Sequence, residues 1–171
     1  MSKTTVASTG IDLSDNFAFS GTVTGASKIV QVKNIITTTE ASGATTMPHD
    51  DTIPQNTEGN EFFTLAITPT SATNKLLILV SFNGVCETAL AELMVGLYQD
   101  STADAIAVGN ARVGTQTIAN HIINFQHFMT AGTTSATTFK IRAGNGGGYT
   151  RMNDYLSTAN PSGMTIMEIA E

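Results

Sequence analysis

The residues best suited to acid–base or metal chemistry are the three histidines and the carboxylates near them. His49 directly precedes Asp50 and Asp51, and a base beside two carboxylates can hold a cation or transfer a proton. Pro48 stands before them, and aspartates in such a segment commonly cap turns through the nearby backbone. We therefore interpret this stretch as a loop with structural aspartates.

The other two histidines, His121 and His127, have the same parity within one expected strand and so face the same side. Six residues of strand separate them by about 20 Å, which is too far for the two side chains to share one ion. We expect no metal site and no cofactor.

Motifs of nucleophilic and phosphate chemistry are missing from the sequence. The stretch 144–148 (GNGGG) is rich in glycine, but no Lys-Ser/Thr pair follows to complete a phosphate loop. Glycoside hydrolysis requires two carboxylates about 5–10 Å apart, and Glu58 with Glu61 would be an arbitrary choice. Cys86 follows an apolar stretch and is expected to be a buried thiol. We predict that the protein is not an enzyme and has no catalytic residues.

A second kind of chemistry, surface recognition, is possible in the loop-like stretch 143–162. It holds Tyr149 and Tyr155 together with Arg151 and Asn153. Polar and aromatic side chains on an exposed loop of a rigid scaffold are a common contact surface. We predict that these four residues contact a receptor or a host-surface glycan. The alternative is that both tyrosines pack under their own loop.

Composition limits the partners. Only 13% of the 171 residues are charged, and the formal net charge is −6. The 8 Lys and Arg residues are scattered, whereas nucleic-acid binding requires them in clusters. No apolar run approaches the roughly 18 residues that a membrane span needs, and the N-terminus lacks the apolar core of a signal peptide. We expect no nucleic-acid partner, no membrane insertion, and synthesis in a cytoplasm without secretion.

The elements that must position these residues are strands. Alternating or continuous apolar patterns rich in β-branched residues predict strands, separated by turn signals, and little helix; the strands are expected at residues 28–39, 60–68, 75–83, 93–99, 118–130, 137–142 and 163–169, with a weak one near 105–108. The stretch 75–83 is almost continuously apolar, which is typical of a central strand covered on both faces. Residues 87–94 are the one segment that favours a helix. The fold class predicted is all-β, an antiparallel β-sandwich of the jelly-roll type.

Residues 1–27 differ from the rest, since they are small, polar and interrupted by glycine. We predict an extended N-terminal arm over 1–27 and a β-sandwich domain over 28–171. Phe17 and Phe19 lie two residues apart, on one side of an extended chain, and could dock into a groove on a neighbouring subunit. The alternative is a frayed leader without a partner.

Several segments of the chain resemble a domain of tailed-bacteriophage virion proteins. They are residues 52–59 (TIPQNTEG), 64–69 (TLAITP), 74–78 (NKLLI), 99–102 (QDST), 127–134 (HFMTAGTT), 138–144 (TFKIRAG) and 163–169. Upstream, residues 17–25 are similar to segments that precede such domains in phage fibre proteins. The resemblance covers about 28–171 and implies a jelly-roll-like sandwich, usually trimeric, in a tail fibre, tail spike or head-surface protein. These motifs carry no chemistry, so no catalytic residue is transferred.

The resulting hypothesis is a virion structural protein of a tailed phage, acting as a short tail fibre or spike component. Its expected partners are itself, as a homotrimer, other virion proteins through the arm, and a host-surface glycan. One alternative is a capsid decoration protein that stabilises the shell as a trimer. Another, from a different class, is a host-glycan-binding lectin domain.

Overall fold

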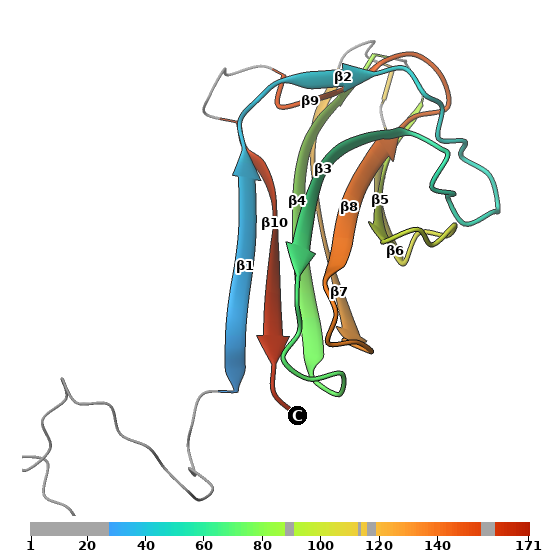
Figure 1. The fold of residues 1–171 in the computed structure, drawn as a ribbon. Helices are drawn as coiled ribbons and strands as arrows, with labels where there is room; N and C mark the ends of the chain where they lie inside the picture. Colours follow the sequence, from blue (N-terminus) through green and yellow to red (C-terminus); the bar gives the residue numbers. More distant parts are fainter. Residues whose placement is uncertain (1–27, 88–90, 113, 116–118, 155–159) are drawn as a thin grey trace, which may run out of the picture.

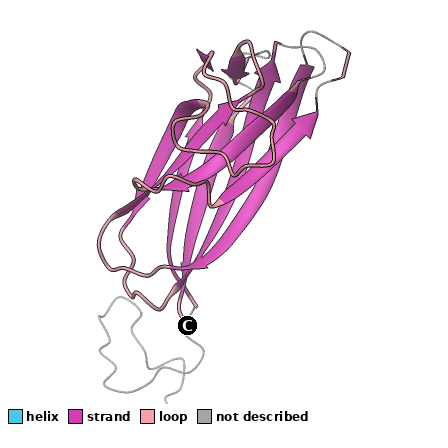
Figure 2. Ribbon diagram, turned by 90° about the vertical axis from the view of Figure 1, so that its right-hand side faces the viewer, coloured by secondary structure: helices cyan, strands magenta, loops and turns pink. Residues whose placement is uncertain are grey.

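A computed structural model describes residues 28–87, 91–112, 114–115, 119–154 and 160–171. All the regular elements in these ranges are strands, and they form two antiparallel sheets stacked as a sandwich (Figures 1 and 2). The expected arm 1–27, with Phe17 and Phe19, lies outside the described residues and stays a prediction.

The first sheet is built around its longest strands. β4 (Lys75–Cys86) pairs along its whole length with β7 (Ala119–Thr130). Its other edge pairs with β10 (Ser162–Ile169) and then with the short β9 (Thr150–Met152). Outside these lie β1 (Ile29–Thr37), paired with β10, and β2 (Ala41–Gly43), paired with β9. Over most of its length the sheet therefore has the order β1, β10, β4, β7.

The second sheet has the order β3, β8, β5, β6. These strands are β3 (Asn60–Ile67), β8 (Thr137–Gly144), β5 (Glu92–Gln99) and β6 (Ala107–Arg112). Consecutive strands β3, β4 and β5 alternate between the two sheets, and β7, β8 and β9 alternate again. With the short strands β2 and β9 set aside, the remaining eight strands form two four-stranded sheets, which is the jelly-roll arrangement, so the predicted fold class is confirmed.

The expectation of a helix over 87–94 is wrong for the part that the structure describes, because β5 already begins at Glu92. Leu93 and Val95 belong to the core between the sheets. Met94 and Tyr98 point to the opposite face of β5 and are buried as well. Both faces of this strand are thus covered, and an apolar run without alternation does not distinguish such a strand from a helix.

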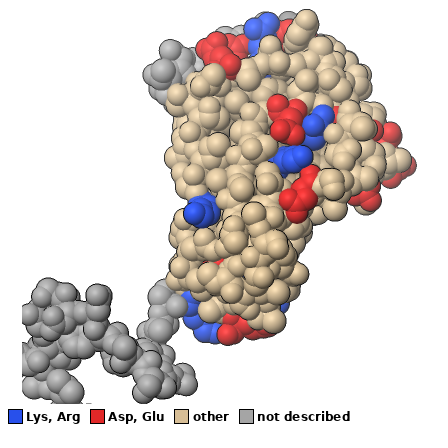
Figure 3. Space-filling view, viewed as in Figure 1, with Lys and Arg blue, Asp and Glu red and all other residues tan. Residues whose placement is uncertain are grey.

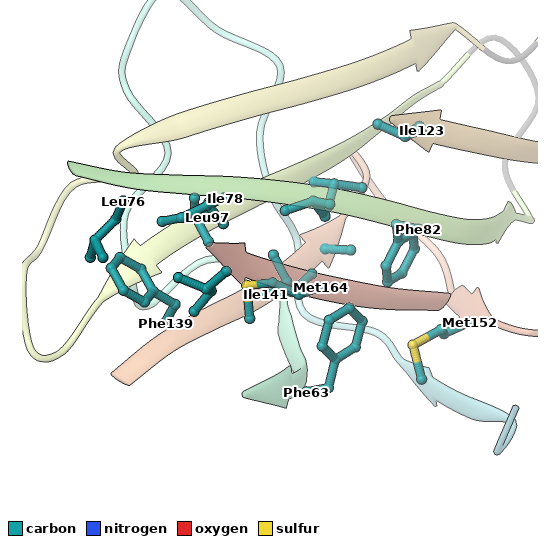
Figure 4. Packing of buried hydrophobic residues seen from close by; sticks show 14 of the residues in the cluster. Phe63, Leu76, Ile78, Phe82, Leu97, Ile123, Phe139, Ile141, Met152 and Met164 are labelled. Carbon is teal, nitrogen blue, oxygen red and sulfur yellow. The ribbon is translucent and has the colours of Figure 1, made fainter. Parts of the chain in front are cut away.

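The core fills the space between the sheets (Figure 4). Even-numbered residues of β4 face inward because side chains alternate along a strand; these are Leu76, Ile78, Val80 and Phe82. They meet Leu97 of β5 together with Phe139 and Ile141 of β8. The Phe82 ring also lies edge-on to Phe62, with 5.3 Å between ring centroids. This shared core fixes the position of the first sheet relative to the second.

One buried carboxylate ties three segments together at the end of the sandwich where the chain terminates. Glu168 of β10 has no exposed surface. Its oxygens accept hydrogen bonds from Gln31 Nε2 (2.5 Å) of β1, and from Asn74 Nδ2 (2.6 Å) and Thr70 N (2.8 Å) of the β3–β4 connection. Burial by itself raises the pKa of Glu168, but the bonds from Gln31, Asn74 and Thr70 outweigh it and lower the pKa to about 2. The group is therefore a structural anion.

Candidate interaction surfaces

The most distinctive surface of the molecule is the outer face of the first sheet, which we call the open face. It consists of the outward-pointing side chains of β1, β10, β4 and β7. On β4 these are the odd-numbered residues, because the even-numbered ones enter the core. Leu77 and Leu79 are only half-buried in the single chain. The sequence predicted that this strand is covered on both faces; from Lys75 to Ser81 the described chain covers only one of them, whereas the outward-facing Asn83 and Val85 further along are buried.

Cross-strand pairing aligns the residues of the open face in rows. One row is apolar across all four strands, since Val32 pairs with Met167, Met167 with Leu77, and Leu77 with Phe128. The two edge residues of this row, Val32 and Phe128, are 52% and 58% exposed. Aromatic and aliphatic side chains aligned in this way normally lie against another apolar surface rather than water.

The next two rows are neutral and form a groove. Their members are Asn34, Thr165, Leu79 and Gln126 in one row, and Ile36, Gly163, Ser81 and Asn124 in the other. All eight line a hollow of about 590 Å³. Asn34 Nδ2 donates to Thr165 Oγ1 at 2.8 Å, so part of the polar lining is already oriented. A groove with neutral amides, hydroxyls and methyl groups suits an uncharged partner surface.

Charge is nearly absent from the open face. Among the outward-facing residues of β1, β10, β4 and β7 the single ionisable group is Lys75, at the lower end of β4. Lys75 Nζ lies 3.6 Å from a Glu171 carboxylate oxygen, so its charge is already paired. On the side shown in Figure 3, charged side chains gather over the upper part and at the lower tip of the sandwich. None of the outward-facing residues of these four described strands is a carboxylate.

The loop end of the sandwich contains the residues predicted to contact a receptor. Tyr149 is 51% exposed and directly precedes β9. Arg151 is partly exposed and binds Glu87 (2.5 Å) and Asp154 (3.6 Å). The prediction that Asn153 is a surface contact residue is wrong. Asn153 is fully buried, and its amide donates to the backbone oxygens of Thr37 and Thr39.

Its positive φ of 58° and the bond from Ser162 Oγ to its Oδ1 (2.7 Å) identify Asn153 as a structural turn residue. Tyr155 lies outside the described residues. Tyr149 and Arg151 therefore remain the described members of the predicted contact surface.

The other residues considered for chemistry, His49, Asp50 and Cys86, have structural roles. His49 Nε2 lies 2.5 Å from a Glu92 carboxylate oxygen and joins the long loop to β5. Asp50 accepts from the hydroxyl (2.5 Å) and backbone N–H (2.8 Å) of Thr52, and these bonds lower its pKa. That geometry confirms the interpretation of the aspartate as a turn cap. Cys86 is fully buried in the core, as expected.

His121 and His127 both lie on β7 with the predicted parity. Within the described ranges, no group of three or more potential metal ligands comes together. No helix of that part of the chain is long and apolar enough to cross a membrane.

The architecture places this chain in the class of jelly-roll sandwich domains. Comparison with solved structures identifies the same fold in Eiger TNF from S. frugiperda, with a TM-score of 0.50 and 10% identity over 82% of this chain and 94% of that one. Infectious bursal disease virus VP2, in a subviral particle, matches with a TM-score of 0.39 and 14% identity over 82% of this chain. Derived T=1 particles of the same virus give 0.41 and 15%.

The chain spans a little over a third of the length of the bursal disease virus chains, 38% and 36%. At these identities the likeness concerns the fold alone. No protein-family model and no curated protein matches the sequence.

Proposed function

We propose that this chain is a non-enzymatic structural protein of a tailed-bacteriophage virion, working as a homotrimer in a short tail fibre or spike. The observation that carries the proposal is the open face, a broad apolar and nearly uncharged surface on a complete sandwich. A surface of this kind is typical of a subunit that functions inside an assembly. The segments resembling phage virion proteins supply the kind of assembly.

The hydrogen bonds and ion pairs made by the ionisable side chains support a structural role. Glu168 is saturated with hydrogen bonds, His49 is bound to Glu92, and Arg151 is bound to two carboxylates. Each holds two or more segments of the chain in place. Chemistry at such groups would require breaking the contacts that position the loops.

The position of the chain's parts supports a fibre or spike. β1 begins at the end of the sandwich where β10 terminates, while β2, β9 and the loops around them lie at the opposite end (Figure 1). Tyr149 immediately precedes β9 and so belongs to that opposite end. An arm attached at residue 28 would join the virion at one end and leave Tyr149 and Arg151 to contact a host at the other.

Particles made without this chain test the proposal. A fibre or spike component predicts intact heads that adsorb to cells at a strongly reduced rate, restored when the chain is supplied in trans. The capsid decoration alternative predicts normal adsorption but heads that burst on heating or at low salt. Particles unchanged in both properties would contradict a structural role in the virion.

Removal of the arm separates assembly from folding. We expect a chain without residues 1–27 to remain a folded trimer, because every described strand lies in 29–169, and to be missing from purified particles. Circular dichroism and light scattering measure the first property, and immunodetection in gradient-purified particles measures the second. Incorporation at the normal level would refute attachment through the arm.

The lectin alternative is favoured by one observation, the half-exposed Tyr149 two residues before the partly exposed Arg151. If the chain binds a glycan there, Tyr149→Ala should weaken binding on a glycan array by roughly 2- to 13-fold, the loss expected for one aromatic contact of about 0.5–1.5 kcal/mol. Ile53→Ala changes another exposed side chain, 56% accessible, and should leave binding unaltered. Absence of any glycan binding by the unaltered trimer would remove this alternative.

A further inference from the structure

We propose that the open face is the surface through which copies of this chain pack against one another, with the β1 rim of one copy against the β7 rim of the next. The inference rests on the homotrimer of the proposed function and deepens it by naming the interface. It commits to a second copy of this chain as the occupant of the face.

The first argument comes from β4. Its sequence is apolar at successive positions, which is typical of strands buried on both faces. The second sheet covers the even-numbered residues, whereas Leu77 and Leu79 on the other side keep part of their surface. Complete burial of this strand therefore requires a surface from outside the described chain.

The second argument is the distribution of exposed apolar side chains. Nine large hydrophobic side chains are exposed in the described residues, and six of them belong to β1 or β7, the two edge strands of this one sheet. The six are Ile29, Val30, Val32, Ile36, Ile122 and Phe128. Two apolar rims on opposite edges of one face suit a head-to-tail contact, which closes into a ring when it is repeated by rotation.

Charge favours a copy of the chain over a charged partner. Each chain carries a net charge of −6, so two copies repel over most of their surfaces. The open face has no carboxylate among its outward-facing residues in the four described strands, and its one lysine is paired. The amides of Asn34, Asn124 and Gln126 both donate and accept hydrogen bonds, so identical surfaces can satisfy one another.

The dimensions of the open face show how much of an interface it can supply. At about 3.3 Å per residue, the seven residues of β4 that pair with β10, Lys75 to Ser81, extend over roughly 23 Å, and four strands are about 19 Å wide. The sheet therefore offers a flat footprint of roughly 440 Å². A stable protein–protein interface buries about 800 Å² on each partner. The open face thus supplies about half of such an area, and the adjoining loops must supply the rest.

The test uses the full-length chain with two charges introduced at the rims, Ile36→Glu on β1 together with Phe128→Glu on β7. Both side chains are more than half exposed, so the single chain can accommodate the changes. The matched control is Ile53→Glu together with Val108→Glu, which places the same charges on exposed apolar positions away from the face. Light scattering after size exclusion gives the native mass, and circular dichroism reports the fold.

We expect the unaltered chain and the control to have three times the 17.9 kDa of one chain. The rim variant should be a folded monomer, its association weakened on the order of 1,000-fold, as for two central contacts of about 2 kcal/mol each. If the rim variant fails to fold, the single variants Ile36→Glu and Phe128→Glu take its place, with the same expectation of monomers. A folded rim variant that stays trimeric overturns the interface while the trimer stands. An unaltered chain that is monomeric overturns the interface and the homotrimer together, and the particle experiment still decides the virion role.

Discussion

Replacing Phe82 by alanine is expected to lower the free energy of unfolding by about 3–5 kcal/mol, the range for large-to-small changes in a packed core. Phe82 has no exposed surface and contacts the core between the two sheets. Its ring also loses the edge-on contact with Phe62. The sandwich cannot close such a cavity without moving β4, which is hydrogen-bonded along both edges.

Phe128→Ala is the matched comparison, since it removes the same side chain from the open face of the adjacent strand. Phe128 is 58% exposed in the single chain, so its removal should change the unfolding of the monomer by less than about 1 kcal/mol. Phe128→Ala should instead weaken association of the chains, so the stability that it removes should depend on protein concentration. Urea denaturation at several protein concentrations separates the two effects. Equal, concentration-independent losses in both variants would contradict the assignment of the two faces.

The second large effect is expected at Glu168. Glu168→Gln should lower the free energy of unfolding at pH 7 by about 2–4 kcal/mol, because an amide group then faces the donors of Gln31, Asn74 and Thr70. The change keeps the size of the side chain, so the loss reports the hydrogen bonds and the charge rather than a cavity.

The same carboxylate predicts how stability depends on pH. Its pKa falls from 4.5 to about 2 on folding, so the unfolded chain binds the proton more tightly than the folded chain. The stabilisation is therefore complete above pH 4.5 and is lost as the pH falls towards 2. It amounts to roughly 3 kcal/mol, at about 1.4 kcal/mol per pKa unit. The Gln variant should lack this part of the acid sensitivity.

Glu61→Gln serves as the control, because that side chain is 40% exposed and lies 3.8 Å from Arg142. We expect it to retain the stability and the acid profile of the unaltered chain, as surface ion pairs contribute little. Denaturation midpoints measured between pH 2 and pH 7 for the three proteins test this. An unchanged acid profile in Glu168→Gln would contradict the role assigned to the buried carboxylate.

The local sequence pattern was sufficient to predict the β-sandwich. Alternation and β-branched composition located most of the strands, since burial of one face in a sheet requires a period of two. The apolar run of β4 was correctly predicted as a central strand, but the described chain does not bury its outer face at Leu77 and Leu79. The helix expected over 87–94 failed because Met94 and Tyr98 are buried on the outer side of β5, and the tertiary contacts that bury them leave no signal in a short window.

The roles of individual site residues were harder to predict from the sequence than the strands. Asn153 resembled an exposed loop residue, but its partners Thr37 and Thr39 lie more than 110 positions away in the chain. Glu168 shares the inward parity of Met164 and Ile166, which the strand pattern contained. Its donors come from β1 and from the connection before β4, and no local pattern pairs them. The open face could not be predicted from the sequence, because its rows of side chains depend on the register of four strands.

The central claim is that this chain is a repeated structural component of a virion, and its copy number in purified particles tests that claim most directly. Quantitative mass spectrometry against the major capsid protein gives this number. We predict a multiple of three, between a few and a few dozen copies, as for a tail fibre or spike built from trimers. Hundreds of copies would instead identify the decoration alternative. Absence from purified virions would contradict the account.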